Sequence, residues 1–178
     1  MGLLLLAVAL AFGFALLLSR ASRTPDVGGL APGSRAPEIT AAGWLNGEPP
    51  EDRQGRVMFV HAWFTTCPHC RLRAPELVEL HERFRSRGVI FVGLTFEGPE
   101  SLPEVEAYVG ETGMTWPNGY GAVETLRALE AEFFPAAWII DRGGQVVWNS
   151  GSGEDPAAAM ERALAQAPPG SSEPRSSL

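Results

Sequence analysis

The sequence predicts a single α/β domain in which helices cover both faces of a mixed β-sheet. Residues 57–63 and 89–96 are apolar runs rich in β-branched and aromatic side chains, a pattern typical of buried parallel strands. Between them, residues 67–87 carry apolar side chains at helical spacing, which predicts a right-handed crossover helix. Two later runs, 136–140 and 145–148, flank an Asp-Arg-Gly-Gly turn and predict an antiparallel hairpin.

The remaining helices follow from shorter patterns. Residues 103–111 and 121–132 are each expected to form a helix, and the alanine-rich segment 155–166 closes the domain as another. Pro75 falls inside the first helical pattern and is expected to kink that helix, because proline lacks the backbone N–H. The expected order is strand, helix, strand, helix, helix, strand, strand, helix.

The chain of 178 residues divides by composition into a folded unit and its flanks. We expect one domain at 37–167, because a chain of this length suits a single core. Residues 20–36 are rich in Ser, Gly, Pro and Arg, which predicts a flexible linker. Residues 168–178 offer little to pack and predict a disordered tail. Residues 1–19 form a separate apolar segment.

This apolar segment predicts an N-terminal transmembrane helix that precedes the domain. Residues 2–18 hold no charged side chain, and as a helix they span roughly 26 Å, close to the thickness of a bilayer core. Signal-peptide apolar regions are usually shorter, so the length favours a retained membrane anchor over a cleaved signal peptide. Arg20, Arg23 and Arg35 follow the segment, and by charge alone they would place the domain in the cytosol.

Composition excludes several classes of function. The net charge is −7 at pH 7, and the 14 basic residues are all arginines dispersed along the chain, so no nucleic-acid partner is expected. Two cysteines are too few for a disulfide-stapled scaffold. A tetrahedral zinc site would have to recruit His61, His69 or His81 beside them. No resident metal and no cofactor are therefore expected.

The two cysteines stand in a Cys67-Pro68-His69-Cys70 sequence, after a predicted strand and at the start of a predicted helix. A nucleophilic cysteine must be a thiolate, whereas a thiol with the ordinary pKa of about 8.5 is mostly protonated. Unpaired N–H groups and the positive end of the helix dipole favour an anion at Cys67, and Pro68 fits the first turn. Cys70 lies one turn later, close enough to attack a mixed disulfide at Cys67. His69 is expected to lower the Cys67 pKa further.

A second feature is the Phe134-Pro135-Ala136 sequence, which makes Pro135 a candidate for a cis peptide bond. Together these features resemble the thioredoxin superfamily and, within it, the membrane-anchored TlpA/ResA-like thiol-disulfide oxidoreductases. The resemblance implies a thioredoxin fold and covers about residues 33–167. It rests on four segments: GSRAP at 33–37, VMFVHAWFTTCPHCRLRAPEL at 57–77, GVIFVGLTFE at 88–97 and FPAAWIIDRGGQVV at 134–147.

The resemblance implies roles for particular residues. Cys67 is expected to be the exposed attacking sulfur and Cys70 the resolving sulfur. Pro135 is expected to be a cis-proline that faces the site and presents backbone to a bound substrate chain. In the family, an acidic residue at the end of the strand after the first helix helps to move the proton of the resolving cysteine. Glu97 lies at or within one residue of that position, so the resemblance implies that it is a proton carrier.

The resemblance also implies partners and a location. The partners are protein thiols and disulfides together with an upstream membrane redox protein, and the domain is expected to act as a monomer outside the cytoplasm, in the periplasm or cell envelope. We give this implication more weight than the arginines that follow the apolar segment, which by charge alone would place the domain in the cytosol. Substrates in such a family include apocytochrome c cysteines, copper-site thiols and general envelope proteins, and the sequence does not choose among them.

Three positions depart from the family pattern. Thr66 replaces a tryptophan before the first cysteine, Arg73 replaces a glutamate, and Ala136 replaces a threonine after the proline. Partner recognition is therefore expected to differ from that of relatives. The Pro-His dipeptide resembles oxidising DsbA-like proteins, whereas the anchor and domain plan resemble reducing ones, so the direction of electron flow stays open.

Three other interpretations compete with disulfide exchange. A copper or zinc chaperone would use Cys67, Cys70 and one histidine. A peroxiredoxin-type peroxidase is disfavoured, because Phe64 and Val60 stand where that class has threonine and proline. A catalytically inert interaction module would lack the cysteines, and both are present.

Overall fold

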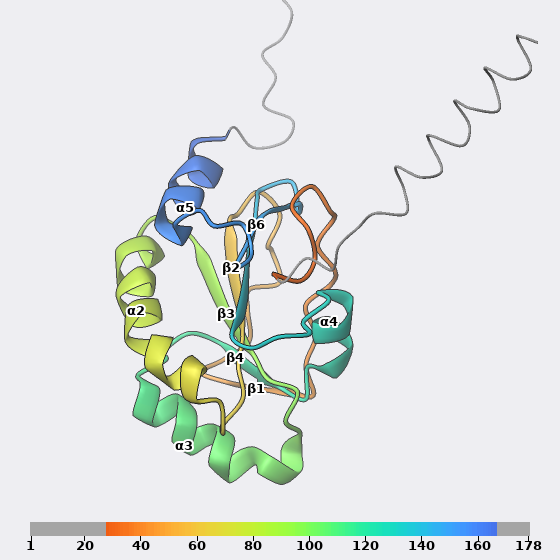
Figure 1. Cartoon of the computed structure of the whole chain (residues 1–178), viewed down its shortest axis with the longest axis vertical. Coiled ribbons are helices and arrows are strands. Elements are labelled where there is room, and N and C mark those ends of the chain that lie inside the picture. Colours follow the sequence, from red (N-terminus) through yellow and green to blue (C-terminus); the bar gives the residue numbers. More distant parts are fainter. Residues whose placement is uncertain (1–27, 167–178) are drawn as a thin grey trace, which may run out of the picture.

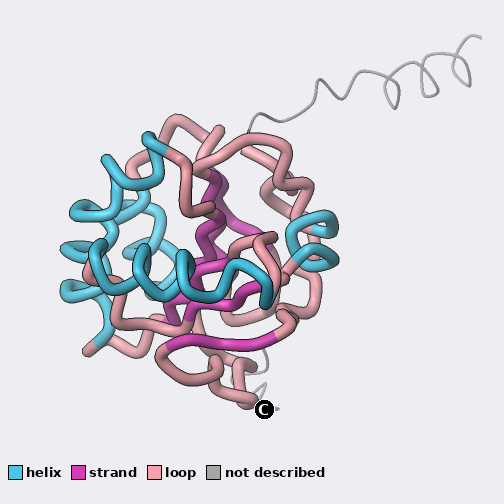
Figure 2. Tube along the Cα trace, turned by 90° about the horizontal axis from the view of Figure 1, so that it is seen from below, coloured by secondary structure: helices cyan, strands magenta, loops and turns pink. Residues whose placement is uncertain are grey.

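Residues 28–166 are described by a computed structural model, in which one six-stranded mixed sheet has helices on both faces (Figures 1 and 2). The strand order is β1-β4-β3-β2-β5-β6. The strands are β1 (Gly43–Leu45), β2 (Met58–Ala62), β3 (Ile90–Leu94), β4 (Asn118–Tyr120), β5 (Ala136–Ile140) and β6 (Val146–Asn149). The helical elements are α2 (Pro68–Arg85), the 3₁₀ turn η1 (Pro99–Ser101), α3 (Leu102–Thr112), α4 (Val123–Ala128) and α5 (Pro156–Ala165).

The central strands confirm the predicted α/β topology. β2 and β3 pair in parallel, and α2 makes the crossover between them. β5 pairs antiparallel with β2 on its other side, with Met58 opposite Ile140 and Ala62 opposite Ala136, and β6 completes the predicted hairpin. α2 continues through Pro75, so this proline does not end the helix.

Three elements differ from the sequence prediction. β1 and β4 are three-residue strands that pair with each other, and neither has a strand-like apolar pattern. α4 forms only the middle of the helix expected at 121–132. It stops because Glu130 adopts a left-handed backbone conformation, with φ of 54°, which a helix does not accommodate.

Successive side chains of a strand point to opposite faces of the sheet, so the buried residues form two clusters, one on each face. α2 and α5 lie on one face, at the left in Figure 1, and α4 lies on the other. The first face buries Phe59, Phe91, Ile139 and Trp148 against residues of α2, α3 and α5. The second buries Val60, Val92, Trp138 and Leu126 together with Ile39.

Backbone hydrogen bonds join residues 33–36 to the hairpin of β5 and β6. Gly33 N–H donates to the Val146 carbonyl at 2.7 Å, and Ala36 N–H donates to the Gly144 carbonyl at 2.9 Å. The described part of the expected linker therefore lies along the hairpin, because these backbone groups need partners at the sheet edge.

The expected membrane segment and the expected tail, residues 1–19 and 168–178, lie outside the described residues. Within 28–166, no helix combines the length and the apolar composition that crossing a bilayer requires.

Candidate active site

The two cysteines form a disulfide at the N-terminus of α2. Cys67 is the N-cap residue, with extended φ and ψ of −83° and 106°, and Pro68 occupies the first turn as predicted. The Cys67 sulfur accepts a hydrogen bond from Cys70 N–H at 3.1 Å. A helix N-terminus favours negative charge, and no acidic residue stands in the first turn of α2 to oppose it. This position therefore suits a Cys67 thiolate once the disulfide is reduced.

Both cysteines are buried in the disulfide form, each with only 3% of its surface exposed. The expectation that Cys67 is an exposed sulfur is therefore wrong for this state. The cause is the capping geometry, because a side chain that accepts the Cys70 N–H turns back toward the helix, and both cysteines join the apolar cluster around Trp63. Pro68 and His69 lie exposed at the surface between them.

Pro135 and Cys70 both line a cavity of about 220 Å³. The Phe134–Pro135 peptide bond is cis, as the sequence suggested. Arg73 also lines the cavity, with 59% of its side chain exposed. The remaining walls are mainly apolar and include Phe59, Leu77, Met114, Ala137, Trp148 and Pro156.

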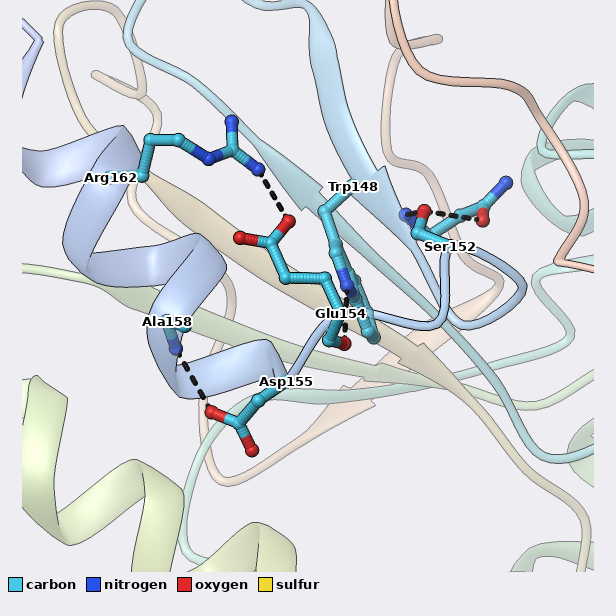
Figure 3. A network of polar contacts seen from close by, with 7 residues as sticks. Trp148, Ser152, Glu154, Asp155, Ala158 and Arg162 are labelled. Atoms are coloured by element: carbon cyan, nitrogen blue, oxygen red, sulfur yellow. Dashed lines mark hydrogen bonds and ion pairs between the residues drawn. The ribbon is translucent and has the colours of Figure 1, made fainter.

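One wall of this cavity is held by the connection between β6 and α5 (Figure 3). Trp148 Nε1 donates to the Glu154 carbonyl at 2.9 Å, and Arg162 Nη2 donates to the Glu154 carboxylate at 2.7 Å. Asp155 caps α5 by accepting Ala158 N–H at 3.0 Å. These bonds fix the Trp148 indole, so the cavity has a defined wall.

Glu97 lies in the loop after β3, three residues beyond the last residue of that strand, and holds the loop that leads to Cys67. Its carboxylate accepts Thr65 N–H at 2.9 Å and the Thr65 hydroxyl at 2.5 Å, one on each oxygen. The Thr95 hydroxyl also donates to it, at 2.9 Å. Sequence reasoning selected Glu97 but missed Thr65, because nothing in the local pattern shows that a loop threonine meets the next strand.

Three aromatic rings pack beside this loop. Phe64, Phe96 and Phe134 have ring centroids 5.5 to 5.7 Å apart in all three pairs. They come from the loops after β2 and β3 and from the residue before Pro135, so they link the three chain segments of the site. Phe96 is 45% exposed, so part of this aromatic cluster faces the solvent.

A stacked aromatic pair, Trp63 and Tyr108, links the start of this loop to α3. Trp63 and Tyr108 stack with centroids 4.4 Å apart, and Trp63 Nε1 donates to the buried Asn118 Oδ1 at 3.2 Å. The Arg71 guanidinium lies 4.8 Å from the centre of the Tyr108 ring. Burial raises the pKa of Tyr108 to about 12, so the phenol stays neutral at physiological pH.

Of the three histidines, His69 lies between the cysteines and His61 lines the cavity beside Cys70. His61, on β2, accepts Trp116 Nε1–H at 2.9 Å on its Nε2 atom, and burial lowers the pKa of His61 to about 3. His81 packs against the Trp116 ring, with centroids 4.9 Å apart. Within residues 28–166, no three histidine, cysteine or carboxylate side chains come together as metal ligands would.

Comparison with known proteins is consistent with this geometry. A family model described as Redoxin matches residues 31–165. The thiol-disulfide oxidoreductase ResA of Bacillus anthracis is 25% identical over 101 residues, which cover 54% of this chain and 56% of ResA. ResA of Oceanobacillus iheyensis is 24% identical over 147 residues, which cover 81% and 74%. The chain thus matches little more than half the length of the first of these relatives.

Solved structures establish the fold. A thiol-disulfide isomerase from Corynebacterium glutamicum superposes with a TM-score of 0.65 at 20% identity, covering 76% of this chain and 99% of that one. The thioredoxin domain of a thiol-disulfide oxidoreductase from Bacteroides vulgatus gives 0.64 at 24% identity, covering 75% and 97%. The fold is therefore the thioredoxin-like fold that the sequence predicted. With the family model matching most of its length, the chain belongs to the Redoxin family and is a TlpA/ResA-like member of the thioredoxin superfamily.

Proposed function

We propose that the protein is a thiol-disulfide oxidoreductase that exchanges its Cys67–Cys70 pair with the cysteines of protein partners outside the cytoplasm. The observation that carries the proposal is the disulfide at the head of α2, where the Cys67 sulfur accepts the Cys70 N–H. The match to the Redoxin family and the names of the ResA relatives support the same chemistry.

Oxidation of a partner proceeds in two exchange steps. A partner thiolate attacks the Cys67 sulfur, which breaks the Cys67–Cys70 bond and releases Cys70 as a thiolate that takes up a proton. The second partner thiolate then attacks the partner sulfur of the mixed disulfide and releases Cys67 as a thiolate. The partner loses two electrons and the cysteine pair gains them. Reduction of a partner runs through the same steps in reverse.

The direction of exchange is set by the reduction potential, which the geometry leaves open. Equilibration of the full chain in glutathione buffers, with the disulfide fraction counted after alkylation, measures that potential. A value near about −270 mV identifies a reductant, and one near about −120 mV identifies an oxidant. A protein whose cysteines do not equilibrate with glutathione at all, but bind copper or zinc stoichiometrically, is a metal chaperone instead.

The cavity beside Cys70 is proposed to receive a side chain of the partner. It is mainly apolar, and Pro135 places it next to the site at which a partner chain would pair. Arg73 lines this cavity with its guanidinium paired to Glu76 at 3.3 Å, and Glu154 also lines it. These charged groups are proposed to contribute to the recognition of the partner.

Glu97 and His69 are proposed to support the exchange. Glu97 anchors the loop before Cys67 through Thr65, and its role as proton carrier for Cys70 stays a prediction. His69 is exposed and lies between the two cysteines, next to Cys70 and two residues after Cys67, which supports its proposed role in lowering the Cys67 pKa.

Residues 2–18 are proposed to anchor the protein to a membrane. Their uncharged, apolar composition supports this. The protein is proposed to act there as a monomer and to exchange electrons with an upstream membrane redox partner. The test compares membrane fractionation of the full chain with that of a variant lacking 2–18. Labelling of reduced cysteines in intact cells with an impermeant maleimide reports the compartment. A full chain found in the soluble fraction, or labelled only after lysis, contradicts the proposal.

A further inference from the structure

A cleft of about 820 Å³ lies at the end of the sheet away from the cysteines. Met58 and Ile140, which pair at that end of β2 and β5, line it. The site end of the same strands is marked by Ala62 opposite Ala136, four residues or about 13 Å away. The cleft walls come from three chain segments, residues 35–39, 51–56 and 141–144.

The arginines within residues 28–166 fall into two sets, those that form an ion pair with a carboxylate and those that do not. One set has a carboxylate within 4.0 Å: Arg71, Arg73, Arg83, Arg85, Arg87, Arg127 and Arg162. The other set has no such partner within residues 28–166 and lines this one cleft: Arg35, Arg53, Arg56 and Arg142. Arginines that are dispersed in the sequence are therefore gathered by the fold at a single place.

Most donors of these four guanidinium groups are not used by the described chain. Arg53 and Arg56 each donate one bond to a backbone carbonyl, at 3.5 and 3.4 Å, and Arg142 donates one to the Gln166 carbonyl at 2.8 Å. A guanidinium has five N–H donors, so several stay open on each group. Arg53, Arg56 and Arg142 are also half-buried, where an unpaired charge is less well solvated.

Three carboxylates also line the cleft, those of Glu38, Glu51 and Asp141, and none forms an ion pair with the four arginines. Asp141 is committed to the hairpin turn, because its Oδ1 accepts Gly143 N–H at 2.8 Å and Gln145 N–H at 2.9 Å. Glu38 and Glu51 are exposed and lie beyond ion-pair distance of the four arginines. A net charge of −7 means that the whole chain does not attract anions, so any anion bound here is held by local contacts.

We propose that this cleft binds a phosphate-bearing anion through Arg35, Arg53, Arg56 and Arg142. Guanidinium groups bind phosphate oxygens in bidentate pairs, and a cleft of this size has room for more than one phosphate group. Two sources share this chemistry, a soluble phosphate compound and the headgroup of an anionic lipid. The lipid source rests on the proposed anchor, because Arg35 follows the apolar segment 2–18 by at most about 60 Å of extended chain.

The test uses the full chain in a non-ionic detergent, titrated with sodium pyrophosphate and followed by calorimetry. Wild type is compared with R53Q/R142Q and with R127Q, a matched control whose arginine pairs with Glu124 on α4. We expect R53Q/R142Q to lose about tenfold or more in affinity, because two charged hydrogen-bond donors are removed from the cleft. R127Q keeps wild-type affinity. R53K/R142K retains the charge and is expected to bind with intermediate affinity, which separates lost contacts from misfolding.

A second arm identifies the source of the phosphate. The full chain is placed in nanodiscs of phosphatidylcholine, with or without phosphatidylglycerol, and hydrogen exchange is measured at residues 51–56 and 141–144. Slower exchange only with phosphatidylglycerol, abolished in R53Q/R142Q, identifies a lipid headgroup, whereas pyrophosphate binding alone identifies a soluble ligand. Binding that R53Q/R142Q retains, or neither ligand binding to wild type, overturns the proposal. Disulfide exchange is unaffected by either result, so the proposed function is judged separately.

Discussion

Thr65 donates its backbone N–H to one oxygen of the Glu97 carboxylate and its hydroxyl to the other, at 2.9 and 2.5 Å. The loop after β3 thereby fixes the loop that enters α2 at Cys67. The Glu97 carboxylate accepts the hydrogen bond in each of these contacts.

Glu97→Gln is expected to lower the free energy of unfolding by about 1–2 kcal/mol, because hydrogen bonds to a charged group contribute about 1.5–3 kcal/mol when buried and this one is half-buried. Urea unfolding of the oxidised protein measures the loss. Glu106→Gln, an exposed carboxylate on α3, is the matched control and should change little. Coupling to Thr65→Val in a double-mutant cycle is expected. If Glu97 acts only as a proton carrier, the substitution shifts the pH profile of exchange and leaves stability as in wild type.

Acid is expected to destabilise the fold through His61. Its pKa is about 3 in the folded protein, below the ordinary 6.5, because burial disfavours the charged ring. Between those values the unfolded chain binds a proton that the folded chain does not, so stability is lost as the pH falls below 6.5. The slope due to this group is about 1.4 kcal/mol per pH unit.

His61→Gln keeps an acceptor for Trp116 and should remove that slope when urea unfolding is repeated between pH 7 and 4. His69→Gln, on the surface, is the control and should retain it. An unchanged slope in His61→Gln would show that other groups, His81 among them, govern the acid response.

His69→Ala is expected to raise the Cys67 pKa of the reduced protein and to make the couple more reducing. The physical reason is the loss of a positive or hydrogen-bonding ring beside a thiolate, whose stability sets how readily the disulfide is reduced. Titration of thiolate absorbance near about 240 nm, together with the glutathione equilibrium, measures both effects. An unchanged titration curve assigns His69 to the solvent-facing surface only.

Ala137→Leu is expected to slow exchange with a protein partner by filling part of the cavity beside Cys70. Exchange with glutathione should change little, because a small thiol does not need the cavity. Overpacking costs about 1–3 kcal/mol, so thermal unfolding is measured alongside. Ala128→Leu, on the exposed end of α4, is the matched control. Equal slowing with glutathione and with protein would show that the substitution disturbs the cysteines themselves.

The parts of the fold that were predictable have local causes. β2 and β3 are continuous apolar runs, and α2 has an apolar period with a proline in its first turn, so each is visible in its own segment. β1 and β4 are not visible in this way, because β4 reads Asn-Gly-Tyr and exists only through pairing with its neighbours. Gly93 permits that pairing, since a Cβ there would overlap the Asn118 side chain.

The residues of the candidate site also fall into those that the sequence predicts and those that it does not. Cys67 and Cys70 were predictable because they form a distinctive motif, whereas the cis bond before Pro135 was expected mainly from the family resemblance. Thr65, Phe96 and Tyr108 were not, because their roles arise from contacts between elements that are far apart in the sequence. Burial of the Cys67 sulfur also depends on packing around the cap, which a motif does not encode.

The attacking role of Cys67 is tested most directly by capturing a mixed disulfide with single-cysteine variants. Reduced Cys70→Ser and Cys67→Ser proteins are mixed with a peptide disulfide, and intact mass is followed over time. Cys70→Ser is expected to form a one-to-one adduct at Cys67 at least about tenfold faster than Cys67→Ser forms one at Cys70, because only Cys67 caps the helix. Equal rates in the two variants, or no adduct in either, would contradict disulfide exchange at this site.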